Sequence, residues 1–236
     1  MIDPGALREA LDETRERLDE AAARGGRPAG AVELVLAGKY IGAAAAGSLV
    51  DAGVAVLGEN RLQDLQAKRA EVGDRLTFDF IGHIQRRKAR DVVRLCRLIH
   101  SVDSARLAAE IAARAEGEIR VLVEVNVAEE PTKGGIVPAQ LRAFVEEVSV
   151  HADLTIGGLM VMPPFSTDAE SSRRWFAAAR DLAGGLADEW RGRHDFRDLS
   201  MGTSQDFLVA AEEGATKVRV GRGLLDRVQA TSAGIS

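Results

Sequence analysis

Residues 32–40 read Val-Glu-Leu-Val-Leu-Ala-Gly-Lys-Tyr, an aliphatic and β-branched run that predicts a buried β-strand ending in a lysine. Alternation along this strand would place Val35, Ala37 and Lys39 on one face. A lysine at the exit of a central strand needs a partner or a role. One role is to form a Schiff base with an aldehyde, because a desolvated amine loses its proton readily and becomes a nucleophile. The alternative is an ordinary lysine whose ammonium extends into water.

Similar runs recur along the chain, and each is followed by a segment with helical periodicity. This alternation indicates parallel strands with helices packed outside them. The expected strands are 32–40, 54–57, 78–82, 98–101, 119–127, 154–161, 199–202 and 217–221. Eight such units predict a single α/β domain over residues 1–236, folded as a (β/α)8 TIM-type barrel with an added N-terminal helix starting near Pro4. An open, doubly wound sheet is the alternative.

Composition and charge exclude several classes of function. The net charge of −5 gives no general attraction to nucleic acid or to an anionic membrane. The N-terminus lacks the apolar core of a signal peptide, and no apolar run is long enough to span a bilayer, so we expect a cytoplasmic protein. The four histidines show no ligand spacing and Cys96 is the only cysteine, so we expect no metal site.

In a barrel of this kind, functional residues lie at the C-terminal ends of the strands. The last two strands end in Met201-Gly202-Thr203-Ser204 and in Gly221-Arg222-Gly223. Barrels commonly bind phosphate in these two loops through backbone amides at a helix N-terminus, and glycine lets the backbone approach the phosphate closely. The alternative is that Thr203 or Ser204 caps a helix and Gly221 turns the chain. The two interpretations use the same donors and do not exclude each other.

Two further side chains have two interpretations each. Asn60 follows the second strand and could face the barrel mouth, but Asn60-Arg61-Leu62-Gln63 also has the spacing of a helix cap. Arg219 lies between two valines of the last strand, so it enters the barrel if the valines face the helices. A buried arginine needs an acceptor. The alternative role of Arg219 is a structural ion pair with a barrel carboxylate such as Glu124 or Glu33.

The motifs at the strand ends form a recognisable set. They are the strand ending in Lys39; Gly58-Glu59-Asn60 with Gln63; Phe80-Ile81-Gly82-His83-Ile84-Gln85 with Lys88; Ile99-His100-Ser101-Val102-Asp103; Val125-Asn126-Val127 with Lys133 and Gly135-Ile136; Gly158-Leu159-Met160; Leu199-Ser200-Met201-Gly202 with Ser204 and Asp206; and Val218-Arg219-Val220-Gly221. Together they resemble the pyridoxal-phosphate homeostasis proteins, which are single-domain relatives of the barrel half of alanine racemase. The resemblance runs almost from end to end of the chain.

This resemblance implies that Lys39 holds pyridoxal 5'-phosphate (PLP) as a Schiff base. It implies that Asn60 lies near the phenolic oxygen of the cofactor and that Arg219 faces the pyridine nitrogen. The phosphate would be held by Ser204, Gly221 and nearby amides, and the cofactor-binding set is completed by Met201, Gly202 and Arg222. An arginine cannot accept a proton, so it leaves the ring nitrogen unprotonated and the ring a weaker electron sink. That environment suits a carrier or a racemase better than a transaminase.

Several positions depart from the family pattern. Gly38 replaces the usual small hydroxyl residue before the lysine, and Tyr40 stands where threonine is common. Arg86-Arg87 replaces a pair of the Ser-Asn type. Arg222 stands where a serine or threonine usually contributes to the phosphate site. Arg222 would either add a charge to phosphate binding or crowd the phosphate.

The resemblance favours a protein that binds PLP reversibly and serves in its homeostasis or delivery without substantial catalysis, so we assign no catalytic residue. Its partners would be this small-molecule cofactor and PLP-dependent apo-enzymes, and we expect a monomer rather than a dimer. The alternative is a PLP-dependent, racemase-like enzyme acting on amino acids. Such racemases use a tyrosine base from a partner subunit, and Tyr40 is the only tyrosine here. A third alternative is a barrel enzyme that acts on a phosphate ester, with Lys39 as an electrostatic group.

Overall fold

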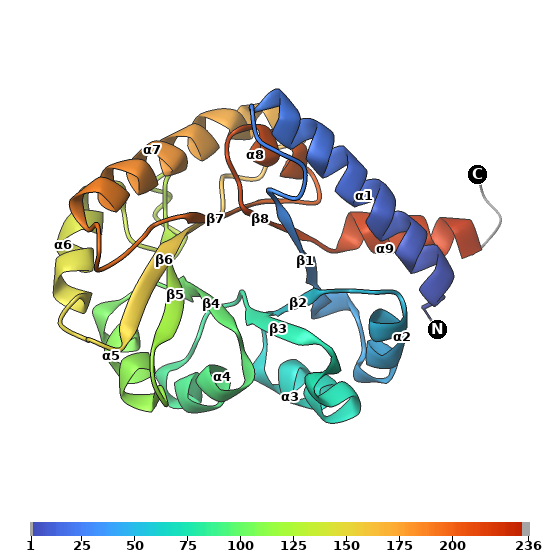
Figure 1. Ribbon diagram of the computed structural model, residues 1–236, viewed down its shortest axis with the longest axis horizontal. Coiled ribbons are helices and arrows are strands. Elements are labelled where there is room, and N and C mark those ends of the chain that lie inside the picture. Colours follow the sequence, from blue (N-terminus) through green and yellow to red (C-terminus); the bar gives the residue numbers. More distant parts are fainter. Residues whose placement is uncertain (1, 233–236) are drawn as a thin grey trace.

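Eight short strands close into a parallel barrel in the computed structural model, which describes residues 2–232 (Figure 1). The strands are β1 (Glu33–Ala37), β2 (Val56–Glu59), β3 (Thr77–Phe80), β4 (Leu98–Val102), β5 (Ile119–Val125), β6 (Leu154–Val161), β7 (Asp198–Thr203) and β8 (Lys217–Val220). The barrel closes because β1 pairs in parallel with β8 as well as with β2. This closure confirms the predicted TIM-type fold. The alternative prediction of an open, doubly wound sheet is wrong.

Helices surround the barrel on its outer side (Figure 1). They are α1 (Pro4–Arg24), α2 (Ala46–Asp51), α3 (Leu62–Val72), α4 (Ala89–Leu95), α5 (Ala105–Arg114), α6 (Pro138–Val148), α7 (Arg173–Glu189), α8 (Phe207–Glu212) and α9 (Arg222–Ser232). The added N-terminal helix is α1, which begins because Asp3 accepts a hydrogen bond from the amide of Ala6 at 2.7 Å and Pro4 occupies the first turn. It packs against α8 and α9 and buries Leu7 and Leu11.

The strands alternate between two environments, as their sequences predict. Leu34 and Leu36 of β1 belong to the core between the strands and the helices, whereas Val35 is buried outside that cluster, on the opposite face of the strand. The valines on either side of Arg219 belong to the same outer core. The prediction that Arg219 points into the barrel is therefore confirmed.

The first strand is shorter than predicted. β1 ends at Ala37, and residues Gly38–Tyr40 form one turn of 3-10 helix that carries Lys39 at the rim of the barrel. The turn follows at once because Gly38 packs directly against the buried carboxylate of Glu59, where no larger residue would fit. Within residues 2–232, no helix combines the length and the apolar composition that a membrane crossing requires.

Candidate functional site

A cavity of about 730 Å³ opens where β1, β2, β3, β6, β7 and β8 end, at the C-terminal side of the barrel. Its lining brings together most of the residues predicted from the sequence to bind a cofactor: Lys39, Asn60, Ser204, Arg219, Gly221 and Arg222. These residues come from four different strand ends, so only the closed barrel places them around one space. The cavity therefore gathers an amine, an amide, a hydroxyl and two guanidinium groups around one space.

Two residues of the predicted set lie outside this lining. The side chain of Met201 is fully buried in the core between strands and helices. Gly202 has a φ of 89°, and a Cβ at this position would lie 2.5 Å from the Cβ of Ala210. Gly202 therefore allows α8 to pack against β7, and the structure gives neither residue a side chain in the cavity.

Lys39 lies on the exposed turn after β1, and its closest aromatic neighbour is Tyr40. The Nζ of Lys39 and the Cζ of Arg222 each lie 4.8 Å from the centroid of the Tyr40 ring. Arg222 also donates a hydrogen bond to the Tyr40 hydroxyl at 2.5 Å. Hydrogen bonding from Lys39, and then from Arg222, lowers the pKa of this hydroxyl because both cations favour the tyrosinate. Two of the departures from the family pattern thus contact each other beside the predicted nucleophile.

A candidate anion site lies where the loop after β7 meets the start of α9. The Oγ of Ser204 accepts hydrogen bonds from the amides of Gly221 and Gly223, at 3.3 and 3.4 Å. The carbonyl of Gly221 accepts the first bonds of α9, from the amides of Leu224 and Leu225. The amides at the start of this helix therefore face the loop, where the helix dipole also favours a negative charge.

Neither Thr203 nor Ser204 caps α8, the helix that follows them in the chain. The residue before α8 is Asp206, whose carboxylate accepts from the amide of Thr203 at 2.7 Å, and Ser204 turns instead towards α9. Gly221 lines the cavity and joins β8 to α9. It also packs closely against the end of β1, because a Cβ at this position would lie 3.0 Å from the Cβ of Ala37.

Asn60 lines the cavity and does not cap the following helix. The residue that precedes α3 is Arg61, and no side chain caps that helix. The Oδ1 of Asn60 is buried without a hydrogen-bond partner among the described residues. A buried polar atom without a partner is rare in folded proteins and marks a place where a ligand can supply the missing bond.

Arg219 enters the barrel beneath the cavity and is held by neutral acceptors. Its Nη1 donates to the carbonyl and the hydroxyl of Ser200, at 2.7 and 2.5 Å. Its Nη2 donates to the carbonyl of Val161 at 2.9 Å and contacts the Sδ of Met162 at 2.8 Å. Burial lowers the pKa of Arg219 to about 10, so the guanidinium stays charged at neutral pH.

The alternative of a structural ion pair at Arg219 is wrong. None of the ion pairs found within residues 2–232 includes this guanidinium, whereas Glu33 pairs with Arg97 at 2.8 Å and with Lys217 at 3.4 Å. Burial, together with repulsion from Asp103, raises the pKa of Glu124, and the attraction of Arg219 opposes this shift without direct contact.

Some lining residues were not among those predicted to bind a cofactor. Phe165 and Met162 stand on the loop after β6 with exposed fractions of 78% and 45%, and Gln205 and Asp226 complete the rim. No pattern in the sequence points to Phe165, because its position depends on the path of an irregular, proline-containing loop. The Tyr40–Arg222 contact was also missed, since it joins residues 182 positions apart.

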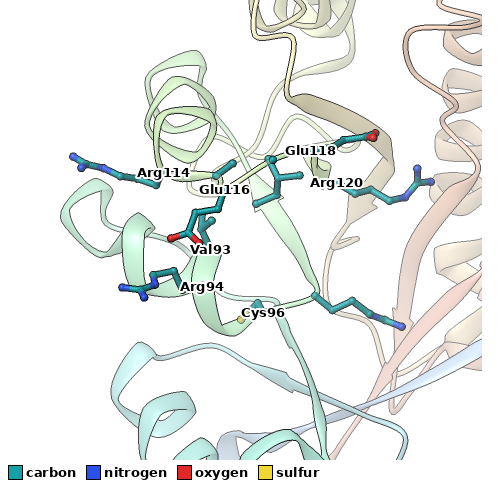
Figure 2. A pocket seen from close by; sticks show the side chains of 11 residues that line it. Val93, Arg94, Cys96, Arg114, Glu116, Glu118 and Arg120 are labelled. Carbon is teal, nitrogen blue, oxygen red and sulfur yellow. The ribbon is translucent and has the colours of Figure 1, made fainter.

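A second hollow of about 580 Å³ lies at the other end of the barrel, between α4, α5 and the start of β5 (Figure 2). Arg94, Cys96, Arg114 and Glu116 line it, and none of the predicted site residues does. Burial raises the pKa of the Cys96 thiol, which keeps it protonated and unreactive. In the described part of the chain, no three histidine, cysteine, aspartate or glutamate side chains gather closely enough to hold a metal ion.

Comparison with known proteins agrees with the resemblance. Residues 6–225 match the family model described as "Alanine racemase, N-terminal domain". A pyridoxal phosphate homeostasis protein of Aquifex aeolicus is 37% identical over 217 residues, which covers 90% of this chain and 94% of that protein. PipY of Synechococcus elongatus, solved with PLP bound, has a TM-score of 0.79 and 33% identity over 92% of this chain and 99% of its own.

More distant structures share the fold alone. Alanine racemase from Clostridium difficile has a TM-score of 0.72 at 17% identity, and the match covers 94% of this chain but only 57% of the racemase. The similarity to the homeostasis proteins extends over nearly the whole length of both chains. The chain therefore belongs to the family of pyridoxal phosphate homeostasis proteins, within the larger family defined by the N-terminal domain of alanine racemase.

Proposed function

We propose that this chain binds PLP in the cavity at the C-terminal end of the barrel, holds it as a Schiff base on Lys39, and serves in PLP homeostasis or delivery without substantial turnover. One observation carries the proposal: the amine of Lys39 and the anion site formed by Ser204, Gly221 and Gly223 line the same cavity. The printed name of the Aquifex aeolicus relative and the PLP bound to PipY support the same ligand.

The residues present fit the chemical groups of this cofactor. When bound, PLP supplies an aldehyde that condenses with an amine and a phosphate that needs hydrogen-bond donors. Among residues 2–232, Lys39 is the only lysine that lines the cavity, and the start of α9 supplies the amides. The buried Oδ1 of Asn60, which has no partner among the described residues, would accept a hydrogen bond from the phenolic hydroxyl of the cofactor.

Arg219 favours a carrier over a transaminase. It would donate to the pyridine nitrogen and cannot give up a proton to it, so the ring would remain a weak electron sink. Tyr40 does not supply the second base of a racemase, because its ring contacts the amine of Lys39 and the two groups stand on the same side of the cavity. Two bases that invert a carbon centre must approach it from opposite faces. We also propose that the chain acts as one domain and as a monomer in the cytoplasm, and delivers PLP to apo-enzymes.

The test is a titration of the purified protein with PLP, followed by borohydride reduction and peptide mapping. We expect a visible absorbance band in the wild-type protein and the reduced cofactor on the peptide that contains Lys39. Lys39→Ala should lose the band, while Lys88→Ala, a lysine outside the cavity, should keep it. A colourless protein would overturn the proposal in favour of a phosphate-ester enzyme, and rapid racemisation of alanine would overturn the carrier role. Reactivation of a PLP-dependent apo-enzyme by the loaded protein tests delivery.

A further inference from the structure

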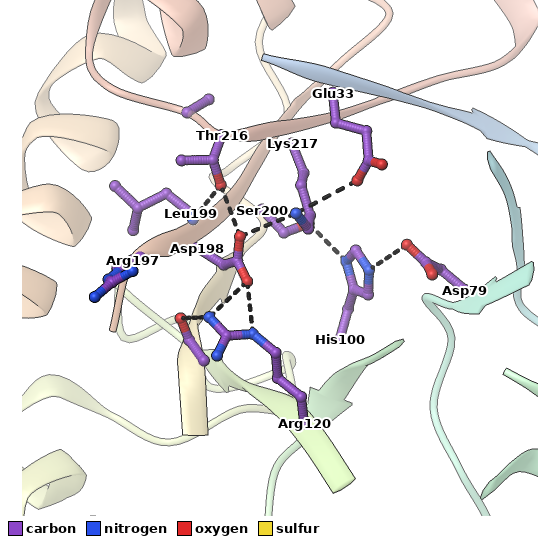
Figure 3. Close-up of polar contacts among 12 residues, drawn as sticks. Glu33, Asp79, His100, Arg120, Arg197, Asp198, Leu199, Ser200, Thr216 and Lys217 are labelled. Carbon is purple, nitrogen blue, oxygen red and sulfur yellow. Dashed lines mark hydrogen bonds and ion pairs between the residues drawn. The ribbon is translucent and has the colours of Figure 1, made fainter. Parts of the chain in front are cut away.

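A line of buried polar side chains crosses the interior of the barrel and ends at Arg219. Figure 3 shows its first part, in which Asp79, His100 and Ser200 lie in sequence across the barrel. The Nε2 of His100 lies 3.1 Å from Oδ2 of Asp79, and its Nδ1 lies 2.8 Å from the Oγ of Ser200. The same Oγ lies 2.5 Å from Nη1 of Arg219. Asp79, His100 and Ser200 are completely buried, on β3, β4 and β7, so water cannot substitute for a missing partner.

The chemistry of the groups fixes the direction of every bond in this line. Burial holds the pKa of His100 below its ordinary value, so the ring is neutral and carries one proton. A carboxylate can only accept, so the proton sits on Nε2 and points to Asp79. Nδ1 must then accept, and in the described part of the chain the hydroxyl of Ser200 is the only group placed to donate to it. The lone pairs of that hydroxyl are thus left to accept from Arg219.

Asp79, the charged end of the line, is kept ionised by hydrogen bonds from His100 and Arg97. Burial alone would raise the pKa of Asp79, but hydrogen bonds from His100 and from Arg97 outweigh it and hold the pKa below its ordinary value. Arg97 donates to Asp79 at 3.0 and 2.7 Å and also holds both oxygens of Glu33 at 2.8 Å. Asp79 is therefore a stable acceptor at neutral pH, which keeps His100 in one tautomer.

At the other end of the line, the hydrogen bonds of Arg219 occupy all but one of its donors. A guanidinium has five N–H groups. The two on Nη1 are taken by the carbonyl and hydroxyl of Ser200, and the two on Nη2 by Val161 and Met162. The Nε–H is the one donor of Arg219 left without a partner among the described residues, and Arg219 lines the cavity.

We propose that Asp79 and His100 are positioning residues, which act through the Ser200 hydroxyl to hold the Arg219 guanidinium in one orientation and leave its Nε–H for a ligand in the cavity. Without Asp79, the proton of His100 would be free to move to Nδ1. The Ser200 hydroxyl would then face two donors, Nδ1–H of His100 and Nη1–H of Arg219. Arg219 would lose a fixed acceptor although it touches neither Asp79 nor His100. The inference rests on the proposed function only where PLP serves as the probe.

The first measurement uses the ligand-free protein. The chain has four histidines, so nitrogen NMR of the labelled protein can resolve His100, whose signal is identified by its loss in His100→Gln. We expect the Nε2–H tautomer in the wild-type protein and the Nδ1–H tautomer in Asp79→Asn, whose amide would donate to the ring. The matched control is Glu33→Gln, which removes another partner of Arg97 and leaves the line intact; it should keep the wild-type tautomer. A wild-type Nδ1–H tautomer would overturn the proposal.

The second measurement is PLP binding, followed by absorbance. Asp79→Asn and Ser200→Ala should each weaken affinity about tenfold, as expected for one buried hydrogen bond, and shift the pH at which the visible band changes. The double variant should be no weaker than the worse single variant, because both changes break one line. Ser200→Thr, which keeps the hydroxyl, should recover most of the affinity, and Glu33→Gln should stay within about twofold of wild type.

The positioning role would be overturned if the losses of affinity in the two single variants multiplied in the double variant. It would also be overturned if Glu33→Gln lost as much affinity as Asp79→Asn, because either result would show a general structural effect. If Asp79→Asn fails to fold, two results still test the positioning role. They are the tautomer of His100 in the wild-type protein and the difference in PLP affinity between Ser200→Ala and Ser200→Thr. A wild-type protein that shows the expected tautomer but binds no PLP would overturn the proposed function and leave the orientation of Arg219 standing.

Discussion

The buried ammonium of Lys68 donates a hydrogen bond to the carbonyl of Gly38 at 3.1 Å, directly beneath the turn that carries Lys39. The same Nζ pairs with Oε1 of Glu59 at 2.6 Å, and the two side chains are 2% and 0% exposed. A side chain at position 38 would collide with this carboxylate. The turn of the predicted nucleophile is thus held by a buried ion pair, and the Glu59 carboxylate fills the space beside Gly38.

Removal of Lys68 should therefore destabilise the protein strongly. Lys68→Met leaves Glu59 as an unpaired buried charge, a change that typically costs about 3–5 kcal/mol of unfolding free energy. Burial raises the pKa of Glu59 even beside Lys68, so a proton on this carboxyl favours the folded state. The defect of Lys68→Met should shrink as the pH is lowered towards 4.5, the ordinary carboxyl value, and grow as the pH rises.

Urea unfolding at several pH values measures this effect. The compensating variant Lys68→Met with Glu59→Gln removes the unpaired charge and should recover part of the lost stability and most of its pH dependence. A defect of Lys68→Met that is the same at all pH values would contradict this account of the ion pair.

A side chain at position 38 should disturb the same turn. Gly38→Ser would place a Cβ against the Glu59 carboxylate, and overpacking of this kind costs about 1–3 kcal/mol. The matched control is Gly42→Ser, four residues later, because a Cβ at Gly42 would meet nothing within 4 Å. Thermal unfolding should show a clear loss for Gly38→Ser and little change for Gly42→Ser. Equal melting temperatures for the two variants would contradict this explanation of Gly38.

Much of the fold and of the site could be predicted, because both depend on local pattern. The alternation of strand residues was enough to turn Arg219 into the barrel and to put Lys39 on its rim. The pairing of Lys68 with Glu59 was not predicted, because a lysine on a helix normally extends into water and only tertiary packing buries it here. The site roles of Met201 and Gly202 stay predictions, since Met201 packs in the core and Gly202 serves helix packing.

Tyr40 should titrate at a lower pH than an ordinary tyrosine. It is the only tyrosine in the chain, so ultraviolet titration of the ligand-free protein reports this hydroxyl alone. Its pKa is held below the ordinary value of 10.0, first by Lys39 and then by Arg222. Lys39→Met should therefore raise the midpoint more than Arg222→Gln, and both changes together should bring it close to the ordinary value. A midpoint that neither variant moves would show that the two cations do not contact the hydroxyl in solution.

Arg222 should strengthen binding of the phosphate group rather than crowd it. The residue is exposed at the start of α9, where its charge adds to the helix dipole and to the amides of Gly221 and Gly223. Arg222→Ser, which restores the residue type expected from the resemblance, should weaken PLP binding about twofold to fivefold at low salt, because an exposed charge contributes about 1 kcal/mol or less. The difference should largely vanish in 1 M salt, where the Debye length is about 3 Å.

Arg227→Ser is the matched control, since Arg227 lies on the same helix but pairs with Glu13 of α1 at 3.0 Å. Tighter binding by Arg222→Ser at low salt would mean that the arginine crowds the phosphate.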